Sequence, residues 1–203
     1  MRTLHLVLAL VLGGLSACDE AGGGACPGTS VDGLQGTGVP ALCYLVPAEC
    51  QGGRWATVAS VYDGDTVTLS DGAKVRLLGI NAPEQPDGSA AGDPEQDPVT
   101  CGGPDAGTYL RSWILGREVC LMDSPLAGPE EDKYGRQLKY LFVDGVNVNQ
   151  LLVATGHACY YDDFSEPYCH EAFLTEEARA DGLGLGIWGL CAAIHGDPCA
   201  RND

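Results

Sequence analysis

Short runs of alternating apolar and polar residues in the middle of the chain predict a small β domain. Three consecutive runs, separated by turn residues such as Asp and Gly, are expected to form strands at residues 56–62, 65–69 and 74–80. Two later apolar runs are expected to form strands at residues 118–122 and 137–143. The turns between the first three strands are short enough to give an antiparallel meander.

Apolar residues also recur at helical spacing, and a Gly follows each of these segments. The predicted helices span residues 108–115, 149–155 and 170–180. The stretch from Pro83 to Gly107 is rich in Pro, Gly and acidic residues, so we expect it to be a long loop. Five strands with about three helices, mainly β with α, predict a small closed five-stranded barrel of the OB-fold type.

Composition divides the chain into four parts. Residues 54–190 contain all the predicted strands and helices and are expected to form one folded domain. Residues 1–17 have the pattern of an export signal, and residues 18–53 that of a tether that contains Gly and Cys. Residues 191–203 are expected to form a cysteine-bearing tail.

The end of the export signal predicts attachment of a lipid. Its apolar segment, residues 4–15, follows Arg2 and is too short to span a bilayer as a mature helix. The next residues, Leu15-Ser16-Ala17-Cys18, resemble the lipobox of bacterial lipoproteins, in which the Cys becomes the lipidated N-terminus. We therefore expect an exported lipoprotein that is anchored to a membrane through Cys18, with a plain secreted protein as the alternative.

Ten cysteines in a chain with an export signal predict disulfides rather than redox catalysis. Lipidation of one leaves an odd number, and Cys120, in an apolar run, is expected to be a buried free thiol. Proximity in the sequence favours three local bridges, Cys43–Cys50, Cys159–Cys169 and Cys191–Cys199. A zinc site of Cys159, Cys169 and His170 is the alternative, but its spacing matches no common zinc motif.

The charge of the whole chain opposes binding to nucleic acid. The formal net charge is -17, from 28 acidic and 11 basic residues, and this charge repels a polyanion at long range. However, nine of the eleven basic residues lie between Arg54 and Arg179. The field around the predicted domain can therefore differ from that of the whole chain.

Three polar clusters in the predicted domain contain the residue types of a metal-dependent phosphodiesterase. They are Asp63-Gly64-Asp65-Thr66, Asn81-Ala82-Pro83-Glu84 and Asp132-Lys133-Tyr134-Gly135-Arg136. Calcium prefers oxygen ligands, which Asp65, Asn81 and the Ala82 carbonyl can supply. Glu84 can hold or deprotonate a water for attack on phosphorus. Arg76 and Arg136 can bind phosphate oxygens in a bidentate manner.

The turn at Asp71-Gly72 decides how Arg76 meets the first cluster. A two-residue turn pairs Arg76 with Val67, whereas a three-residue turn pairs it with Thr66. Both registers leave Arg76 within two positions of Asp65. Only the first is expected to place the two side chains on the same face of the ladder.

The ordered series VYDGDTVTL, VRLLGINAPE, DKYGR and DGVNVNQLLVATG resembles the staphylococcal nuclease (thermonuclease) family. The resemblance extends roughly from Trp55 to Trp188. It implies a five-stranded OB barrel with three helices, and calcium-dependent hydrolysis of DNA and RNA that leaves 3'-phosphates. We expect a monomer that prefers single-stranded or short substrates.

The resemblance also implies roles for the matching residues. Asp65 matches the first calcium carboxylate, Asn81 stands at the position of the second, and Ala82 keeps a carbonyl ligand. Arg76, Glu84 and Arg136 match the catalytic residues, with Glu84 as base or water-orienting group. Binding of substrate is implied for three further residues, Lys133 and Tyr134 at a terminal phosphate and, approximately, Tyr161 (with Tyr160) at a base.

One departure from the family pattern defines a competing hypothesis. Asn81 is neutral where the family has a carboxylate, so the affinity for calcium should fall. The acidic loop after Glu84, with Asp87 and Asp93, can supply a replacement carboxylate, can repel substrate, or can be only a solvated loop, which is the commonest meaning of such a charge run. The alternative to a nuclease is therefore a catalytically weakened or inactive nucleic-acid-binding module, and a purely structural surface lipoprotein is a third possibility.

Overall fold

A computed structural model describes residues 50–85, 101–126, 128–162, 170–191 and 198–199. All of them belong to one compact unit, Val39–Asp203. The predicted export signal, the lipidation site Cys18 and most of the predicted tether lie outside these residues, as do Asp87 and Asp93. Among the described residues, no helix has the length and apolar character needed to cross a membrane.

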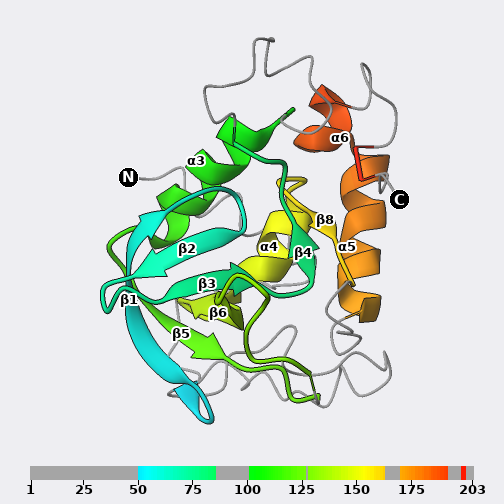
Figure 1. Cartoon of the computed structure of the whole chain (residues 1–203). Coiled ribbons are helices and arrows are strands. Elements are labelled where there is room, and N and C mark those ends of the chain that lie inside the picture. Colours follow the sequence, from blue (N-terminus) through cyan, green and yellow to red (C-terminus); the bar gives the residue numbers. More distant parts are fainter. Residues whose placement is uncertain (1–49, 86–100, 127, 163–169, 192–197, 200–203) are drawn as a thin grey trace, which may run out of the picture. The chain divides into compact units, whose positions relative to one another are not determined.

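Five strands form a closed barrel (Figure 1). Strands β3, β2, β1, β5 and β6 are neighbours in that order, and parallel pairing between β3 and β6 closes the ring. The other pairings among them are antiparallel. The predicted OB-type barrel, mainly β with α, is confirmed. The strands are β1 (Arg54–Val61), β2 (Thr66–Leu69), β3 (Lys74–Leu77), β5 (Glu118–Met122) and β6 (Gln137–Val143).

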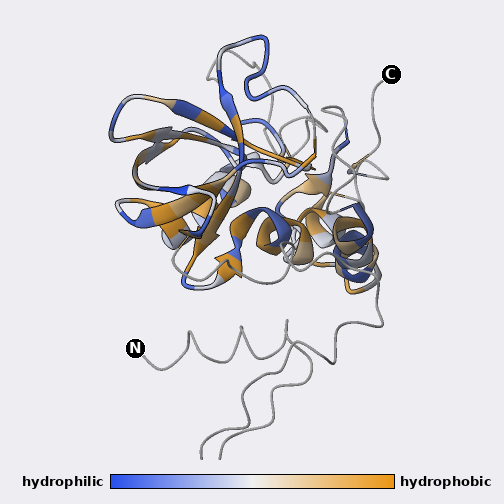
Figure 2. Ribbon diagram, turned by 90° about the horizontal axis from the view of Figure 1, so that it is seen from below, coloured by the Kyte–Doolittle hydropathy of each residue, from blue (hydrophilic) through white to orange (hydrophobic). Residues whose placement is uncertain are grey.

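The barrel is held together by buried apolar side chains along its strands. Val67, Leu77, Leu121, Leu138 and Tyr140 are all buried. Burial of each Val or Leu side chain among them contributes about 1.5–3 kcal/mol relative to exposure. In Figure 2, hydrophobic stretches run along the strands, and hydrophilic residues gather in the turns between them.

Helices pack around this barrel. Helix α3 (Gly103–Ile114) lies against β1, and α4 (Val148–Ala154) lies against both β6 and α5 (His170–Gly182), as Figure 1 shows. A short helix, α6 (Ile187–Leu190), contacts α5. The start expected for the first helix, residue 108, is wrong, because α3 begins at Gly103 with a Pro in its first turn, where the missing N–H does no harm. Residues 103–107 of the expected loop are therefore helical, and its residues 86–100 lie outside the described part of the chain.

The third predicted strand is divided in two. β3 ends at Leu77, and β4 (Ile80–Asn81) leaves the barrel to pair with β8 (Cys159–Tyr160). Gly79 lies between them with a φ of 73°, a conformation that favours glycine and turns the chain. This turn carries the residues after Ile80 away from the barrel ladder. A further two-residue strand, β7 (Val146–Asn147), extends the barrel sheet beyond β6.

Within the described residues, three disulfides join segments that are far apart in the sequence. They are Cys50–Cys120, Cys101–Cys191 and Cys159–Cys199, with sequence separations of 70, 90 and 40 residues. The three predicted local bridges and the free thiol at Cys120 are therefore wrong. The physical reason is the barrel: β1 pairs Trp55 with Cys120, which brings the segment before β1 to the middle of β5.

Candidate functional site

The first polar cluster forms a tight turn, which the side chain of Asp63 stabilises. An Asp63 carboxylate oxygen accepts hydrogen bonds from the backbone N–H groups of Asp65 (2.9 Å) and Thr66 (2.7 Å). Gly64 approaches its neighbours so closely that a Cβ there would lie 2.5 Å from the Cβ of Ala82 and 2.7 Å from that of Ala106. The turn therefore needs both Asp63 and Gly64, and it directs Asp65 into the protein.

Asp65 is buried, and its carboxylate contacts residues of the predicted polar clusters and Arg76. One carboxylate oxygen lies 2.9 Å from Nη1 of Arg76 and accepts a 2.8 Å hydrogen bond from the backbone N–H of Ala82. The other oxygen accepts a 3.0 Å hydrogen bond from the Thr66 hydroxyl. Asp65 thus connects the first two polar clusters.

The observed register pairs Arg76 with Thr66, as expected for the three-residue turn. The expectation that this register separates Asp65 from Arg76 is wrong, because the two side chains form an ion pair. Strict alternation of faces holds only within a ladder. Asp65 precedes the first residue of β2 and belongs to the turn, so its side chain is free of that rule.

Arg76 links both predicted metal-ligand side chains. Besides the ion pair with Asp65, its guanidinium donates hydrogen bonds to the carbonyls of Leu77 (3.2 Å) and Ile80 (2.9 Å). It also donates a 2.8 Å hydrogen bond to the amide oxygen of Asn81. Only 6% of the Arg76 side chain is exposed. A buried guanidinium therefore occupies the space between Asp65 and Asn81.

Burial raises the pKa of Asp65 to about 7, although Arg76 acts to lower it, and the nearby Asp63 adds to the rise. The carboxylate form of Asp65 is thus held at an energetic disadvantage. A cation close to Asp65 would favour that form. The oxygens of Asp65, Asn81 and the Ala82 carbonyl have the chemistry that suits a hard cation such as calcium, but the Arg76 guanidinium lies between Asp65 and Asn81.

The third polar cluster meets the first through Thr66. Arg136 donates a 3.2 Å hydrogen bond from Nη1 to the Thr66 hydroxyl and a 2.7 Å hydrogen bond from Nε to Asp132. Burial opposes ionisation of Asp132, but hydrogen bonds from Arg136 and from the Tyr134 backbone outweigh it and lower the Asp132 pKa. Thr66 therefore bridges Asp65 and Arg136. The sequence offered no signal for this bridge, because it depends on closure of the barrel between β3 and β6.

The side chains of four further predicted site residues, Lys133, Tyr134, Glu84 and Tyr161, take no part in the hydrogen bonds described for this network. Lys133 and Tyr134 are exposed in the turn before β6, and the Lys133 ammonium and Arg136 guanidinium lie 5.1 and 5.4 Å from the centre of the Tyr134 ring. Glu84 is exposed beside the second cluster. Tyr161 follows β8, and its backbone N–H donates a hydrogen bond to the Gly79 carbonyl.

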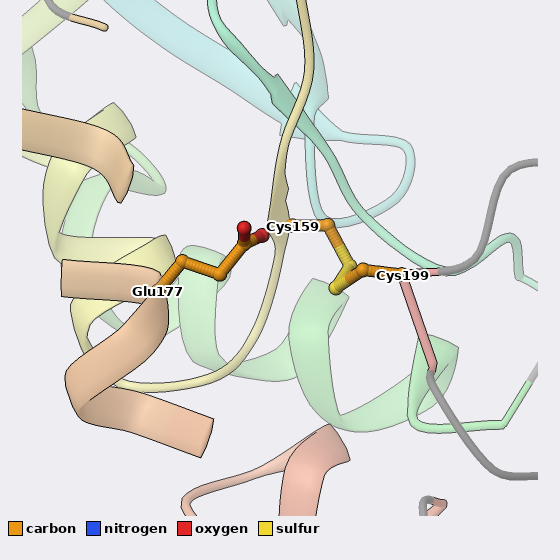
Figure 3. A group of neighbouring side chains, drawn as sticks. All are labelled: Cys159, Glu177 and Cys199. Atoms are coloured by element: carbon orange, nitrogen blue, oxygen red, sulfur yellow. A yellow bond between two sulfur atoms is a disulfide. The ribbon is translucent and has the colours of Figure 1, made fainter. Parts of the chain in front are cut away.

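A cluster of two cysteines and an acid lies near β8 (Figure 3). Cys159 and Cys199 form a disulfide with each other, so neither thiolate can bind a metal. The carboxylate of Glu177 accepts a 2.7 Å hydrogen bond from the backbone N–H of Tyr160. The alternative prediction of a zinc site that includes Cys159 is therefore wrong, and this cluster has a structural role.

Sequence reasoning missed a cavity of about 520 Å³ beside α3. The rings of Tyr109 and His157 stack in its wall with their centres 4.0 Å apart. Burial lowers the pKa of His157, and Asp105 acts in the opposite direction. None of the predicted site residues lines this cavity. Its lining comes from segments far apart in the sequence, and no motif joins them.

Comparison with known proteins agrees with the fold and the clusters. A family model described as staphylococcal nuclease homologue matches residues 74–189. An uncharacterized endonuclease of Escherichia coli O157:H7 is 32% identical over 133 residues, which cover 63% of this chain and 74% of that protein.

Two further relatives have no activity in their names. An uncharacterized protein of Bacillus anthracis is 34% identical over 137 residues, 66% of this chain but only 60% of that protein. An uncharacterized protein of Methanocaldococcus jannaschii is 29% identical over 152 residues, 66% of this chain and 71% of that protein. Because the family model covers more than half of the 203 residues, the chain belongs to the staphylococcal nuclease homologue family.

Proposed function

We propose that this protein is a calcium-dependent nuclease that hydrolyses phosphodiester bonds of DNA and RNA and leaves 3'-phosphates. The observation that carries this proposal is the continuous network from Arg76 through Asp65 and Thr66 to Arg136. It unites a carboxylate with two guanidinium groups, which suit a cation and a phosphate respectively. Membership of a nuclease family and the name of the Escherichia coli relative support the same function.

Each side chain has a defined task in this proposal. Arg136, whose side chain is 23% exposed, binds a phosphate oxygen from the solvent side. Arg76 neutralises charge that develops on the phosphate in the transition state. Glu84 holds or deprotonates the attacking water. Calcium held by Asp65, Asn81 and the Ala82 carbonyl would polarise the phosphodiester.

Lys133 and Tyr134 are proposed to bind the substrate. The Lys133 ammonium is available to a terminal phosphate, because Lys133 is exposed in the turn before β6. Tyr134 is 70% exposed, so its ring can contact a substrate that has already reached Arg136. We propose that single-stranded or short substrates are preferred, because the net charge of -17 opposes tight binding to a long duplex. The protein is proposed to act as a monomer.

The alternative function is a nucleic-acid-binding module without productive metal binding. A specific observation favours it: the amide oxygen of Asn81 already accepts a 2.8 Å hydrogen bond from Arg76. An uncharged amide oxygen that already accepts a hydrogen bond binds a cation more weakly than a carboxylate does. The test is an assay with purified protein, single-stranded DNA and calcium, with a chelator as control. Fragments that carry 3'-phosphates support the nuclease, and binding without cleavage at millimolar calcium supports the alternative.

We expect Asn81→Asp to lower the calcium concentration for half-maximal cleavage by about tenfold or more, because it adds a charged ligand. A calcium titration of the cleavage rate measures this shift. Gln51→Glu adds the same charge at an exposed position and is the matched control. An equal shift in both variants would contradict a direct role for residue 81. If the wild-type chain does not cleave but Asn81→Asp does, the alternative function holds.

We also propose that the protein is exported and anchored to a membrane through a lipid on Cys18. The lipobox-like sequence before Cys18 motivates this proposal, and three disulfides in the described part of the chain suit an oxidising compartment. Mass spectrometry of protein expressed with its native N-terminus in a bacterial host is expected to find a diacylglycerol-modified Cys18. An unmodified Cys18 would refute the lipid anchor.

A further inference from the structure

Contacts of its own side chain do not fix the position of Glu84. It is exposed, and it forms no ion pair or side-chain hydrogen bond with any part of the chain that the structure describes. A group that directs a water must nevertheless keep a fixed position, since misplacement by about 1 Å can lower a rate about 100-fold. The surroundings of the Glu84 backbone must therefore supply the order.

The neighbouring residue, Gln85, is attached to helix α3. Its side-chain amide donates a 2.7 Å hydrogen bond to the carbonyl of Gly103, in the first turn of the helix. This bond connects residues 18 positions apart in the sequence. It fixes the chain directly after Glu84 to a regular element that packs on the barrel.

Helix α3 presents small residues to this segment. We call Gly103, Ala106 and Gly107 the small face of α3. A Cβ at Gly103 would overlap the carbonyl oxygen of Glu84, and a Cβ at Gly107 would overlap the side-chain amide nitrogen of Gln85. All three residues of the small face are buried. Glycine inside a helix costs about 1 kcal/mol relative to alanine, so this close approach is obtained at the expense of helix stability.

The N-terminal end of the same helix is attached to a second element. Cys101, two residues before α3, forms a disulfide with Cys191 directly after α6, and both cysteines are buried. Gly102 lies between this bridge and the small face, where a Cβ would lie 2.7 Å from a methyl group of Ile187. The helix end that receives Gln85 is thus held in place from the opposite side.

We propose that Gln85 is a positioning residue for Glu84, which it holds against the small face of α3. This inference rests on the proposed role of Glu84 and adds to it the element that orders the water-directing group. It also explains the two glycines of the small face, because only residues without a Cβ let the backbone of Glu84 and the amide of Gln85 come so close.

Two substitutions break this attachment in different ways. Gln85→Met keeps the length of the side chain but removes the donor. Gly107→Ala improves the helix and displaces only the flexible end of Gln85, which is the nearest atom to the added Cβ. Gly182→Ala, where the added Cβ meets no atom within 4 Å, is the matched control.

We expect both Gln85→Met and Gly107→Ala to lower kcat for single-stranded DNA by about tenfold or more, with KM within about twofold of the wild-type value. The double variant should be no worse than Gln85→Met alone, because both changes remove one attachment. Gly182→Ala should match the wild-type protein. Wild-type kcat in Gln85→Met, or additive losses in the double variant, would overturn the proposal.

A second measurement does not depend on cleavage. The NMR order parameter of the Glu84 backbone amide should fall from about 0.85 toward 0.6 or below in Gln85→Met and stay unchanged in Gly182→Ala. If the wild-type chain does not cleave DNA, this fall still supports the attachment while the nuclease function fails. An unchanged order parameter in Gln85→Met overturns the attachment whether or not the protein cleaves DNA.

Discussion

Replacement of Glu84 by Gln is expected to lower kcat for cleavage of single-stranded DNA by about 10²–10⁴-fold, the usual contribution of a general base. The substitution keeps the size and hydrogen-bonding reach of the side chain but removes the charge that accepts a proton. Because Glu84 is exposed and unpaired among the described residues, the free energy of unfolding should change by no more than about 0.5 kcal/mol. Single-turnover cleavage at saturating calcium and urea unfolding measure the two quantities.

Glu118→Gln is the matched control for this experiment. Glu118 is also an exposed glutamate, but it lies at the start of β5, and no described contact connects it to the site. It should leave both kcat and the free energy of unfolding unchanged. A Glu84→Gln enzyme with wild-type kcat would remove Glu84 from the mechanism and would leave electrostatic stabilisation by the arginines as the main source of catalysis.

Replacement of Arg76 by Met is expected to destabilise the protein by about 3–5 kcal/mol, the typical result of removing one partner of a buried ion pair. The substitution leaves Asp65 buried beside Asp63 without its cation. It also removes the hydrogen bonds that Arg76 donates to the Ile80 carbonyl and to the Asn81 amide oxygen. Urea unfolding in the absence of calcium measures this change. Cleavage should be lost as well, since the Arg76 guanidinium is proposed to neutralise charge that develops on the phosphate in the transition state.

Arg54→Met is the control that separates the effect of burial on the free energy of unfolding from the effect of losing a charge. Arg54 also pairs with an aspartate, Asp71, at 3.3 Å, but 42% of its side chain and 54% of that of Asp71 are exposed. An exposed pair of this kind contributes about 0–1 kcal/mol. If Arg76→Met and Arg54→Met unfold at the same urea concentration, the buried pair of Asp65 and Arg76 does not stabilise the fold.

The barrel could be predicted from the sequence because its strands are short apolar runs bounded by turn residues, even though β5 is buried at four successive positions rather than at every second one. The start of α3 could not be predicted from the sequence, because this segment contains four residues that favour a loop: Gly102, Gly103, Pro104 and Gly107. Tertiary contacts decide otherwise: the glycines are needed where the helix meets Glu84 and Gln85. A local rule on glycine thus fails where close packing requires glycine.

The candidate site was predictable in part for a similar reason. The motifs identified the polar clusters, but the alternation rule gave the wrong geometry for Asp65 and Arg76, because Asp65 belongs to a turn. Thr66 could not be recognised as a bridge to Arg136, since 70 residues separate them and only barrel closure joins them. The prediction of the disulfide pairing failed for the same reason, because residues that are close in the sequence need not be close in a barrel.

The order of the cysteines has a consequence for biogenesis. Cys101 and Cys159 find their partners only at Cys191 and Cys199, after every strand of the barrel has been synthesised. As the chain is synthesised, Cys120 can already reach Cys50 before the final partners of Cys101 and Cys159 exist. The barrel bridge Cys50–Cys120 is therefore expected to form first, and the Cys159–Cys199 bridge last, because Cys199 is the last of these cysteines to be synthesised. An interrupted chain would expose reactive thiols that a disulfide isomerase or a quality-control protease can recognise.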